Sequence, residues 1–382
     1  MTAPPGDRQD GSLRIAHLTT IDMSLALLLA TELEVDVQAG HQVFGLSAPG
    51  PYVPRVSALG VTHVPLPHLS RSWGLGRDAQ AFRELVRTLR SLELDVLHTH
   101  NPKTGVMGRI AGRLAGIPVV VNTCHGLWAR PEDSLKKRTF VYGLEGLACR
   151  FSDFELFQNA DDQHTLRRAL RRDRSLVVGN GVDLTRFQPD PVGRARVRSE
   201  LGVGEHELLV GGVGRRVQEK GIFEFVEMAS NLAGRAKFVW VGPNDGEQTP
   251  TDAPVVFPGE RADMPAVYSA FDVFVLPSYR EGFSRAGMEA AACGLPMVLS
   301  DIRGCREVGT HGEHLLLVRP ADPDALTEAV RTLLEDQPLR ERLGTSARTR
   351  ALQHFDQREV AATSLRIYET VAEEKGMTWT SA

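Results

Sequence analysis

Residues 273–293, VFVLPSYREGFSRAGMEAAAC, decide how the second half of the chain folds. The apolar run 273–276 predicts a buried strand, and the pattern of residues 286–293 predicts a helix. Ser284 stands between them in the position that an N-cap residue prefers, which turns the amides of Arg285, Ala286 and Gly287 toward a bound anion. The positive end of the helix dipole strengthens this preference. The stretch therefore predicts an anion-binding turn, with Glu281 in the loop and Glu289 inside the helix, where their carboxylates can accept hydrogen bonds from sugar and ribose hydroxyls. The other reading of the same residues is a solvated helix with ordinary surface glutamates.

The same alternation of apolar runs and helical patterns extends over nearly the whole chain and predicts an α/β fold with two doubly wound, Rossmann-like domains. The predicted strands are residues 13–18, 42–47, 62–66, 96–99, 119–123, 154–157, 176–178, 208–212, 238–241, 255–257, 273–276, 297–299 and 315–318. The predicted helices are residues 24–39, 76–92, 105–114, 132–150, 161–170, 221–232, 264–270, 286–293, 324–334 and 339–374, the last of them helical throughout.

A break in this alternation, FQPDPVG at residues 187–193, predicts a linker between the domains. The sequence thus predicts a disordered tail over residues 1–12, an N-terminal domain over 13–187, a C-terminal domain over 188–355, and a C-terminal helix and tail over 356–382. Two such domains side by side would face a central cleft between the carboxyl ends of their sheets. Open α/β sheets bind ligands at these ends, so the cleft is the predicted binding site.

Composition excludes several classes of protein. A length of 382 residues suits two domains, and a formal charge of −4 argues against a general nucleic-acid binder. No apolar stretch approaches the roughly 20 residues of a membrane span, and the polar start of the chain does not resemble a secretory signal. The four cysteines lack metal-binding spacing and indicate free thiols, which predicts a cytoplasmic protein.

A second glycine-rich turn, GVGRRVQEKG at residues 212–221, follows another predicted strand. Arg215 and Lys220 at this edge of the sheet would neutralise a diphosphate and stabilise a leaving group. The segment is neither a GxGxxG nor a GxxxxGK[ST] loop, and its alternative reading is a turn with solvated basic residues.

The remaining polar residues carry weaker signals. His98 and His100 share one face of a strand, but no third ligand is nearby in the sequence, so no metal is predicted there. His100 either serves an acceptor cleft or caps a turn, and Lys103 either binds an acidic acceptor group or is solvated. The arginines at 167, 168, 171, 172 and 174 would contact anionic lipid, or form a helix surface balanced by nearby aspartates.

These motifs together resemble the retaining glycosyltransferases of the GT-B fold, family four, and more narrowly the bacterial enzymes of surface-polysaccharide and glycoconjugate assembly. The residues that carry the resemblance are Arg215, Lys220-Gly221, Pro277-Ser278, Glu281, Glu289, Gly294-Leu-Pro296, His98-Thr-His100-Asn-Pro-Lys103, Gly116-Ile-Pro118, His125-Gly126 and Asn180-Gly-Val-Asp183.

The resemblance implies that the domain over 13–187 binds the acceptor and that the domain over 188–355 binds the nucleotide sugar. It also implies a role for each matching residue. The catalytic residues would be His125, Glu281, Arg215 and Lys220, with His125 reaching the sugar from the N-terminal domain. The donor would be bound by Arg215, Lys220, Gly259, Arg261, Glu281, Phe283, Ser284, Arg285, Ala286 and Glu289. Of these, the amides of Phe283 and Ser284 would assist Glu281 at the sugar, those of Arg285 and Ala286 would hold the diphosphate, Glu289 would bind the ribose, and Gly259 and Arg261 would lie near the base. The C-terminal helix would pack back toward the N-terminal domain.

One departure concerns the loop after the first strand, TTIDMS at residues 19–24, which lacks the glycines usual in the family. Asp22 is therefore expected to face the acceptor, together with His100 and Lys103.

The expected reaction is transfer from a nucleoside diphosphate sugar, UDP-linked by family habit, to a hydroxyl or amine of a sugar, lipid-linked or small-molecule acceptor, without an essential metal or other cofactor. Peripheral contact with the inner face of the membrane and the oligomeric state stay open. The alternatives are another GT-B enzyme, such as a sugar-nucleotide epimerase or a pyridoxal-dependent phosphorylase, and a non-catalytic nucleotide-sugar-binding subunit.

Overall fold

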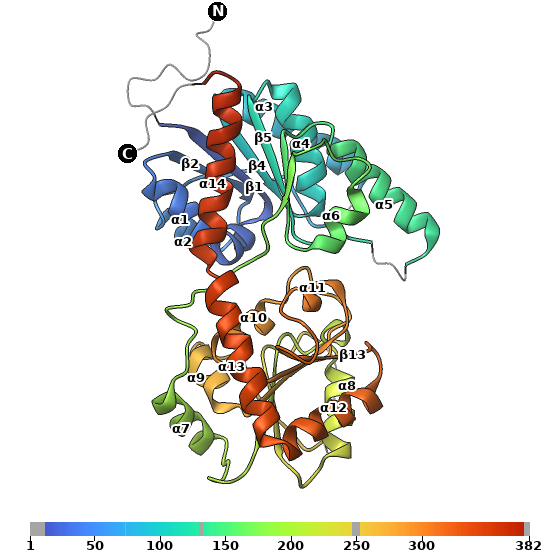
Figure 1. Ribbon diagram of the computed structural model, residues 1–382. Helices are drawn as coiled ribbons and strands as arrows, with labels where there is room; N and C mark the ends of the chain where they lie inside the picture. Colours follow the sequence, from blue (N-terminus) through green and yellow to red (C-terminus); the bar gives the residue numbers. More distant parts are fainter. Residues whose placement is uncertain (1–11, 73, 130–132, 247–252, 378–382) are drawn as a thin grey trace, which may run out of the picture. The chain divides into compact units, whose positions relative to one another are not determined.

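The computed structural model describes residues 12–72, 74–129, 133–246 and 253–377 (Figure 1). The chain forms two compact units, one up to Val178 and again from Arg358, the other from Gly179 to Gln357. Most of the tail predicted over residues 1–12, and the last five residues of the one predicted within 356–382, lie outside the described residues.

The first unit is built on a seven-stranded parallel sheet. Its strands, in spatial order, are β3 (Thr62–Pro65), β2 (Gln42–Ala48), β1 (Arg14–Ile21), β4 (Val96–His100), β5 (Val119–Cys124), β6 (Phe154–Phe157) and β7 (Ser175–Val177). Its helices are a π-helical segment (Ser24–Leu28), α1 (Ala30–Gln38), α2 (Val53–Ser57), α3 (Leu75–Ser91), α4 (Pro102–Ala115), α5 (Leu135–Ala148), α6 (Ala160–Leu166) and α14 (Gln357–Glu374).

The last helix, α14, completes the core of this first unit. Tyr368, Val371 and Ala372 on α14 pack in one apolar cluster with β1, β4, β5 and β6. Figure 1 shows α14 lying along this sheet. The predicted return of the C-terminal helix to the N-terminal domain is confirmed.

The second unit repeats the architecture with a six-stranded parallel sheet. Its strands, in spatial order, are β10 (Val255–Gly259), β9 (Lys237–Val241), β8 (Leu209–Val213), β11 (Val273–Leu276), β12 (Met297–Ser300) and β13 (Leu316–Val318). Its helices are α7 (Pro191–Glu200), a 3₁₀ turn (Gln218–Lys220), α8 (Ile222–Asn231), α9 (Met264–Ala270), α10 (Arg285–Ala292), α11 (Arg303–Arg306), α12 (Pro323–Glu335) and α13 (Gln337–His354).

In each sheet the strand order reverses direction at one place, between β1 and β4 in the first unit and between β8 and β11 in the second. The loops that leave these neighbouring strands diverge to opposite faces, and ligands of doubly wound sheets bind in the crevice between them. The predicted α/β fold with two doubly wound domains is confirmed, and the reversal points tell where to look for each unit's site.

The division between the units differs from the predicted boundary at residue 187. Residues 179–187 belong to the second unit because Val182 and Phe187 are buried in its core. The Val182 amide also donates to the Phe355 carbonyl at 2.9 Å, and the Gln357 amide donates to the Val182 carbonyl at 3.3 Å. The two crossings of the chain between the units thus lie side by side.

Three predicted segments are corrected by local backbone chemistry. The predicted linker 187–193 contains the start of α7, where the Asp190 carboxylate accepts from the Gly193 amide and Pro191 occupies the first turn. The predicted helix 339–374 is interrupted between α13 and α14, beside the strand-like contact with Val182. The predicted helix 24–39 is divided into the π-helical segment and α1.

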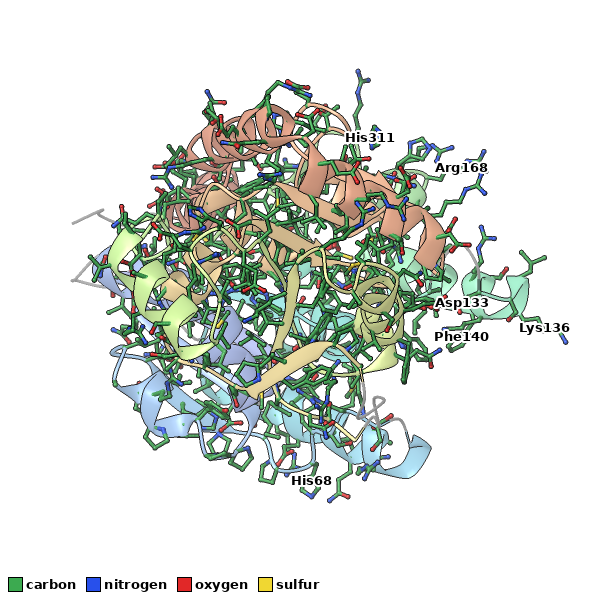
Figure 2. The ribbon with its side chains drawn as sticks, turned by 90° about the horizontal axis from the view of Figure 1, so that it is seen from below. His68, Asp133, Lys136, Phe140, Arg168 and His311 are labelled. Atoms are coloured by element: carbon green, nitrogen blue, oxygen red, sulfur yellow. The ribbon has the colours of Figure 1, made fainter. Side chains whose placement is uncertain are left out.

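The outer face of α5 is unusually apolar for a surface helix. Leu135, Phe140 and Leu147 are 75%, 65% and 57% exposed. Figure 2 shows Lys136 and Phe140 projecting from this helix into solvent. No helix in the described part of the chain has the length and apolar character needed to cross a membrane.

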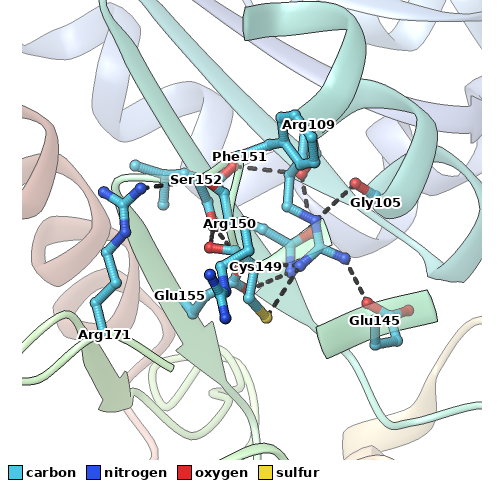
Figure 3. Close-up of polar contacts among 12 residues, drawn as sticks. Gly105, Arg109, Glu145, Cys149, Arg150, Phe151, Ser152, Glu155 and Arg171 are labelled. Carbon is cyan, nitrogen blue, oxygen red and sulfur yellow. Dashed lines mark hydrogen bonds and ion pairs between the residues drawn. The ribbon is translucent and has the colours of Figure 1, made fainter. Parts of the chain in front are cut away.

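The inner face of α5 is held by a buried charge (Figure 3). Arg109 on α4 is 1% exposed, and its guanidinium pairs with Glu145 of α5 and with Glu155 of β6, the latter at 2.8 Å. Its Nε donates to the Gly105 carbonyl at 2.9 Å. One cation thereby joins two helices and a strand beneath the exposed face of α5.

Candidate functional site

The reversal point of the second sheet brings Lys220 and Glu281 together. Lys220 follows β8, Glu281 follows β11, and the Lys220 Nζ atom lies 2.7 Å from Glu281 Oε1. The same carboxylate oxygen accepts from the Ser278 hydroxyl at 2.8 Å. Both charged side chains are largely but not fully buried, with 21% and 10% of their surface exposed. The pair forms a fixed, partly desolvated cation and anion at the carboxyl edge of the sheet, where electrostatic interactions are stronger than in bulk water.

Gly221 makes this close approach of the two loops feasible. Its φ is +75°, and a Cβ atom there would lie 2.1 Å from the Pro277 carbonyl oxygen. The amide of Tyr279 then donates to the Glu219 carbonyl at 2.9 Å, which ties the second loop to the first. Only glycine satisfies both the left-handed backbone and the contact.

Helix α10 begins beside this pair. Ser284 is its N-cap, and the Ser284 hydroxyl accepts from the Gly287 amide at 3.2 Å. The Ser284 amide donates to the Gly304 carbonyl at 3.0 Å. The structure therefore corrects two predicted contacts, that of the Ser284 amide with the donor sugar and that of the Gly287 amide with the anion, because both amides already donate within the protein. Arg285 and Ala286 lie in the first turn of the helix, at the positive end of its dipole.

Glu289 lies in α10 with its carboxylate oriented by two neighbours. Its Oε2 accepts from the Tyr268 hydroxyl at 2.9 Å, and its Oε1 lies 3.2 Å from Arg285 Nε. Burial raises the pKa of Glu289, while Arg285 and Tyr268 act in the opposite direction. Glu289 therefore lies about one turn inside the helix, counted from its positive end at Arg285.

The other predicted donor residues are more dispersed. Arg215 is half exposed and pairs with Asp245 at 2.7 Å, rather than joining the pair of Lys220 and Glu281. Arg261 is held by Asp263 at 2.7 Å and Glu200 at 2.9 Å, so two carboxylates compensate its charge.

Two predicted donor residues act through their backbone or their packing. Gly259 ends β10 with a φ of +82°, and its carbonyl accepts from the Gly242 amide at 2.9 Å. Phe283 is 8% exposed, and its ring packs edge-on against Phe355. Any contact of Phe283 with a donor would come from its backbone.

The reversal point of the first sheet contains a pocket of about 240 Å³. It is formed by the loops that follow β1 and β4, together with two more distant residues. The lining residues are Thr20, Ile21, Ser24, Arg71, Asn101, Pro102, Lys103 and Trp128.

The predicted acceptor residues around this pocket have clear structural contacts. Asp22 is buried, and its two carboxylate oxygens accept from the amides of Met23 at 2.8 Å and Tyr52 at 2.7 Å. The Lys103 ammonium donates to the carbonyls of Ser70 and Ser72 at 3.0 and 2.8 Å and to Asp78 at 2.5 Å. Lys103 thus anchors the loop that carries Arg71 to the start of α4, and both residues line the pocket.

His125 follows β5 and begins a row of hydrogen-bonded side chains. Its Nδ1 lies 2.9 Å from the Gln158 amide nitrogen, and its Nε2 lies 3.0 Å from Nδ1 of His100. His100 continues to His17 at 3.2 Å, and His17 continues to Asp36 at 2.7 Å. Burial lowers the pKa of His125 to about 4 and lowers that of His100 well below its usual range. Both imidazoles are therefore neutral hydrogen-bonding groups at pH 7.

The sequence did not identify several partners of the predicted residues. Tyr268, which orients Glu289, lies 21 residues earlier on another helix. His17 and Asp36, which extend the row from His125, lie on β1 and α1. Of these residues, only His17 could have been suspected from the sequence, because it is a histidine inside a predicted strand, as His98 is. In the sheet His17 stands directly beside His98.

Comparisons with known proteins agree with this division of the chain. Residues 26–181 match the family described as glycosyl transferase 4-like domain, and residues 207–336 match glycosyl transferases group 1.

Two curated relatives cover most of the chain. The chain is 32% identical over 294 residues to the UDP-Gal:alpha-D-GlcNAc-diphosphoundecaprenol alpha-1,3-galactosyltransferase of Escherichia coli, which covers 72% of this chain and 75% of the relative. It is 30% identical over 307 residues to the N,N'-diacetylbacillosaminyl-diphospho-undecaprenol alpha-1,3-N-acetylgalactosaminyltransferase of Campylobacter jejuni, which covers 76% of this chain and 81% of the relative.

A solved structure shares the fold. Anabaena Alr3699/HepE in complex with UDP and glucose superposes with a TM-score of 0.78, at 22% identity, over 94% of this chain and all of that one.

Proposed function

The chain belongs to the glycosyltransferases that combine a glycosyl transferase 4-like domain with a group 1 domain, and from this premise we propose that it transfers a sugar from a UDP-sugar to a lipid-linked acceptor, with retention of configuration. The observation that carries the proposal is the pair of Lys220 and Glu281 beside the first turn of α10. A cation next to the positive end of a helix suits a diphosphate, and an adjacent carboxylate suits a sugar hydroxyl.

In the proposed reaction the bond between the anomeric carbon and the diphosphate oxygen breaks, and a bond to the acceptor oxygen forms. The acceptor proton passes to the departing diphosphate. Lys220 stabilises the negative charge that develops on the diphosphate, together with the helix end at Arg285 and Ala286. Glu281 and Glu289 hold the sugar and the ribose, and Tyr268 keeps the Glu289 carboxylate in place.

The other predicted donor residues complete this proposal. Arg215, half exposed at the same edge, would exchange Asp245 for the diphosphate. Gly259 and Arg261 would lie near the base, and the Phe283 backbone near the sugar. His125, which the resemblance assigns to the donor sugar, would act there as a neutral imidazole.

We place the acceptor in the pocket between the loops that follow β1 and β4. Lys103 lines this pocket, and His100 and Asp22 lie directly beside lining residues in the sequence. The two relatives named above act on sugars linked to diphosphoundecaprenol, and this chemistry supports a lipid-linked acceptor. No essential metal takes part in the transfer step that we propose.

Thermal-shift screening followed by product mass analysis tests the proposal. As the proposed donor class, UDP-sugars are expected to stabilise the chain more than GDP-, ADP- or TDP-sugars. A ligand at about 100 times its Kd adds about 2.7 kcal/mol to the free energy of unfolding. The best donor is then incubated with a polyprenyl-diphosphate-linked sugar and with the same sugar without lipid. Transfer to neither acceptor, despite donor binding, would favour the non-catalytic alternative. Stabilisation by no sugar nucleotide would exclude the donor site.

A lipid-linked acceptor requires contact with a membrane, and we propose that α5 provides it. Phe140 and Leu147 lie seven residues apart and are both well exposed, so they share one helix face. Basic residues lie on and beyond this helix, with Lys136 in its first turn and Arg171 donating to the Arg150 carbonyl beyond its end at 3.1 Å. An apolar face bordered by cations is typical of helices that lie in an anionic membrane surface.

Replacing Phe140 and Leu147 together with serine is expected to weaken binding to anionic lipid vesicles about tenfold or more, since each side chain loses part of the 1.5–3 kcal/mol of a fully buried apolar group. Vesicle co-sedimentation measures the change. Val192→Ser with Leu352→Ser is the matched control, because these side chains are 82% and 52% exposed in the second unit. Equal binding by both double variants would remove α5 from the proposed contact.

A further inference from the structure

Three imidazole rings and one carboxylate converge on one point in the core of the first unit. They belong to His17 on β1, Glu32 on α1, and His98 and His100 on β4. One ligand atom from each residue lies within 4.8 Å of all the others. The three histidines are completely buried. No metal was predicted here from the sequence, because no third ligand lies near His98 and His100 along the chain. The fold brings two further ligands, His17 and Glu32, to the two histidines.

Two of the distances between these ligand atoms match those between the ligands of a tetrahedral metal ion. His17 Nδ1 lies 3.2 Å from His100 Nε2, and His98 Nδ1 lies 3.3 Å from Glu32 Oε1. A tetrahedral zinc ion with bonds of about 2.0–2.1 Å separates its ligand atoms by about 3.4 Å. The two pairs therefore have about the length of opposite edges of such a tetrahedron, and the remaining ligand atoms, which lie within 4.8 Å of one another, would move closer on binding.

We propose that His17, Glu32, His98 and His100 bind a divalent transition-metal ion, zinc by the chemistry of the donor set, as a structural centre of the first unit. Three imidazole nitrogens and one carboxylate oxygen form a ligand set that zinc accepts readily. Four protein ligands leave no open position, which is typical of a structural rather than a catalytic site.

The surroundings of the ligands support this assignment. Histidines that bind metals almost always engage their second ring nitrogen with a carboxylate, a carbonyl or another polar group. Here Nε2 of His17 lies 2.7 Å from Asp36 Oδ2, and Nε2 of His98 lies 2.7 Å from the Thr123 hydroxyl. Nδ1 of His100 lies 3.0 Å from His125. Every proposed imidazole ligand therefore has an outer partner at its other nitrogen.

Tyr368 on α14 completes the centre. Its hydroxyl lies 2.5 Å from His98 Nδ1 and 3.4 Å from Glu32 Oε1. When the His98 nitrogen binds the metal, the Tyr368 hydroxyl donates to Glu32 instead. The ion thus links β1, β4 and α1 directly, and α14 through the tyrosine.

The centre also determines the hydrogen bonding of His125. With Nε2 of His100 on the metal, its remaining proton is on Nδ1, which then donates to Nε2 of His125. His125 must in turn carry its proton on Nδ1 and donate to the Gln158 side chain, with the amide oxygen of Gln158 turned toward it.

Metal analysis of the full-length chain tests the proposal. The protein is purified through a tag without histidine, dialysed against metal-free buffer and analysed by inductively coupled plasma mass spectrometry, with an expected content of about one zinc per chain. The metal is then removed with a chelator and replaced by Co²⁺, which is expected to give the intense visible absorption of a tetrahedral site. Zinc is expected to raise the Tm of the metal-free chain.

Glu32→Gln is expected to lose the metal and the Co²⁺ spectrum. The matched control is His68→Gln, because His68 forms an exposed imidazole–carboxylate pair with Glu84 at 3.0 Å and would account for adventitious binding. A wild-type chain that contains no metal, shows no Tm change with zinc and gives no tetrahedral Co²⁺ spectrum would overturn the proposal, whatever the variants do. So would zinc that survives Glu32→Gln and disappears with His68→Gln. None of these readouts depends on glycosyl transfer.

Discussion

Replacing Lys220 with alanine is expected to lower kcat for glycosyl transfer by about 10²–10³, because removing one preorganised charge contact to a leaving group typically costs about 2.7–4 kcal/mol of barrier. Lys220 is 2.7 Å from Glu281, and the change removes the cation at the diphosphate while leaving that carboxylate without its cationic partner. The measurement is product formation by mass spectrometry at saturating donor, which separates kcat from KM.

The matched control for Lys220 is Lys237→Ala. Lys237 begins β9 of the same unit and pairs with Glu207 at 3.3 Å, at the opposite, amino end of the sheet. It is expected to transfer sugar at the wild-type rate. Because Lys220→Arg keeps a cation near Glu281, partial recovery is expected there. A Lys220→Ala chain that transfers sugar within threefold of wild type would exclude Lys220 from the stabilisation of the leaving group.

Arg109→Met is expected to lower the free energy of unfolding of the first unit by about 3–5 kcal/mol, since removal of one partner leaves the carboxylates of Glu145 and Glu155 buried without their cation. The guanidinium is 1% exposed, so water cannot replace it without opening the contact between α4 and α5. Urea unfolding, followed by a probe in the first unit, measures the loss.

The control for Arg109 is Arg87→Met on α3, where an exposed guanidinium donates to the Arg83 carbonyl at 3.3 Å. Its effect is expected to stay within about 0.5 kcal/mol. Changing Glu145 and Glu155 to glutamine in the Arg109→Met chain is expected to recover part of the stability, because the unpaired charges are then absent. An Arg109→Met chain as stable as the Arg87→Met chain would show that the buried pair contributes nothing.

The positions of most strands along the chain could be predicted from the sequence because these strands are short apolar runs with turn residues at both ends. The run 273–276, for example, matches β11, and 119–123 matches β5 to within one residue. Both faces of a parallel sheet are covered, so its strands are apolar without interruption and easy to recognise. Breaks inside helical patterns were less visible. The interruption between α13 and α14 depends on Val182, some 170 residues earlier, and no local pattern records it.

The candidate site shows the same limit. The position of Glu281 after one strand and Lys220 after another predicts that both lie at one edge, and the reversal of strand order then places them in contact. Whether a single amide is free to bind a ligand could not be predicted in the same way. The Ser284 amide, for example, donates to the Gly304 carbonyl, 20 residues later in the chain. Likewise, His17 and Glu32 join His98 and His100 only through the pairing of β1 with β4 and the packing of α1.

The return of α14 to the first unit sets the order in which the chain can mature during synthesis. The apolar surface of β1, β4 and β5 that receives Tyr368 and Val371 is made early, but its cover is synthesised only after the whole second unit. The second unit contains all of its own core between Gly179 and Gln357, so it can reach its native packing first. Nascent chains that stop before α14 therefore expose a bare β-sheet face, the kind of surface that chaperones bind and that aggregates when it is left uncovered.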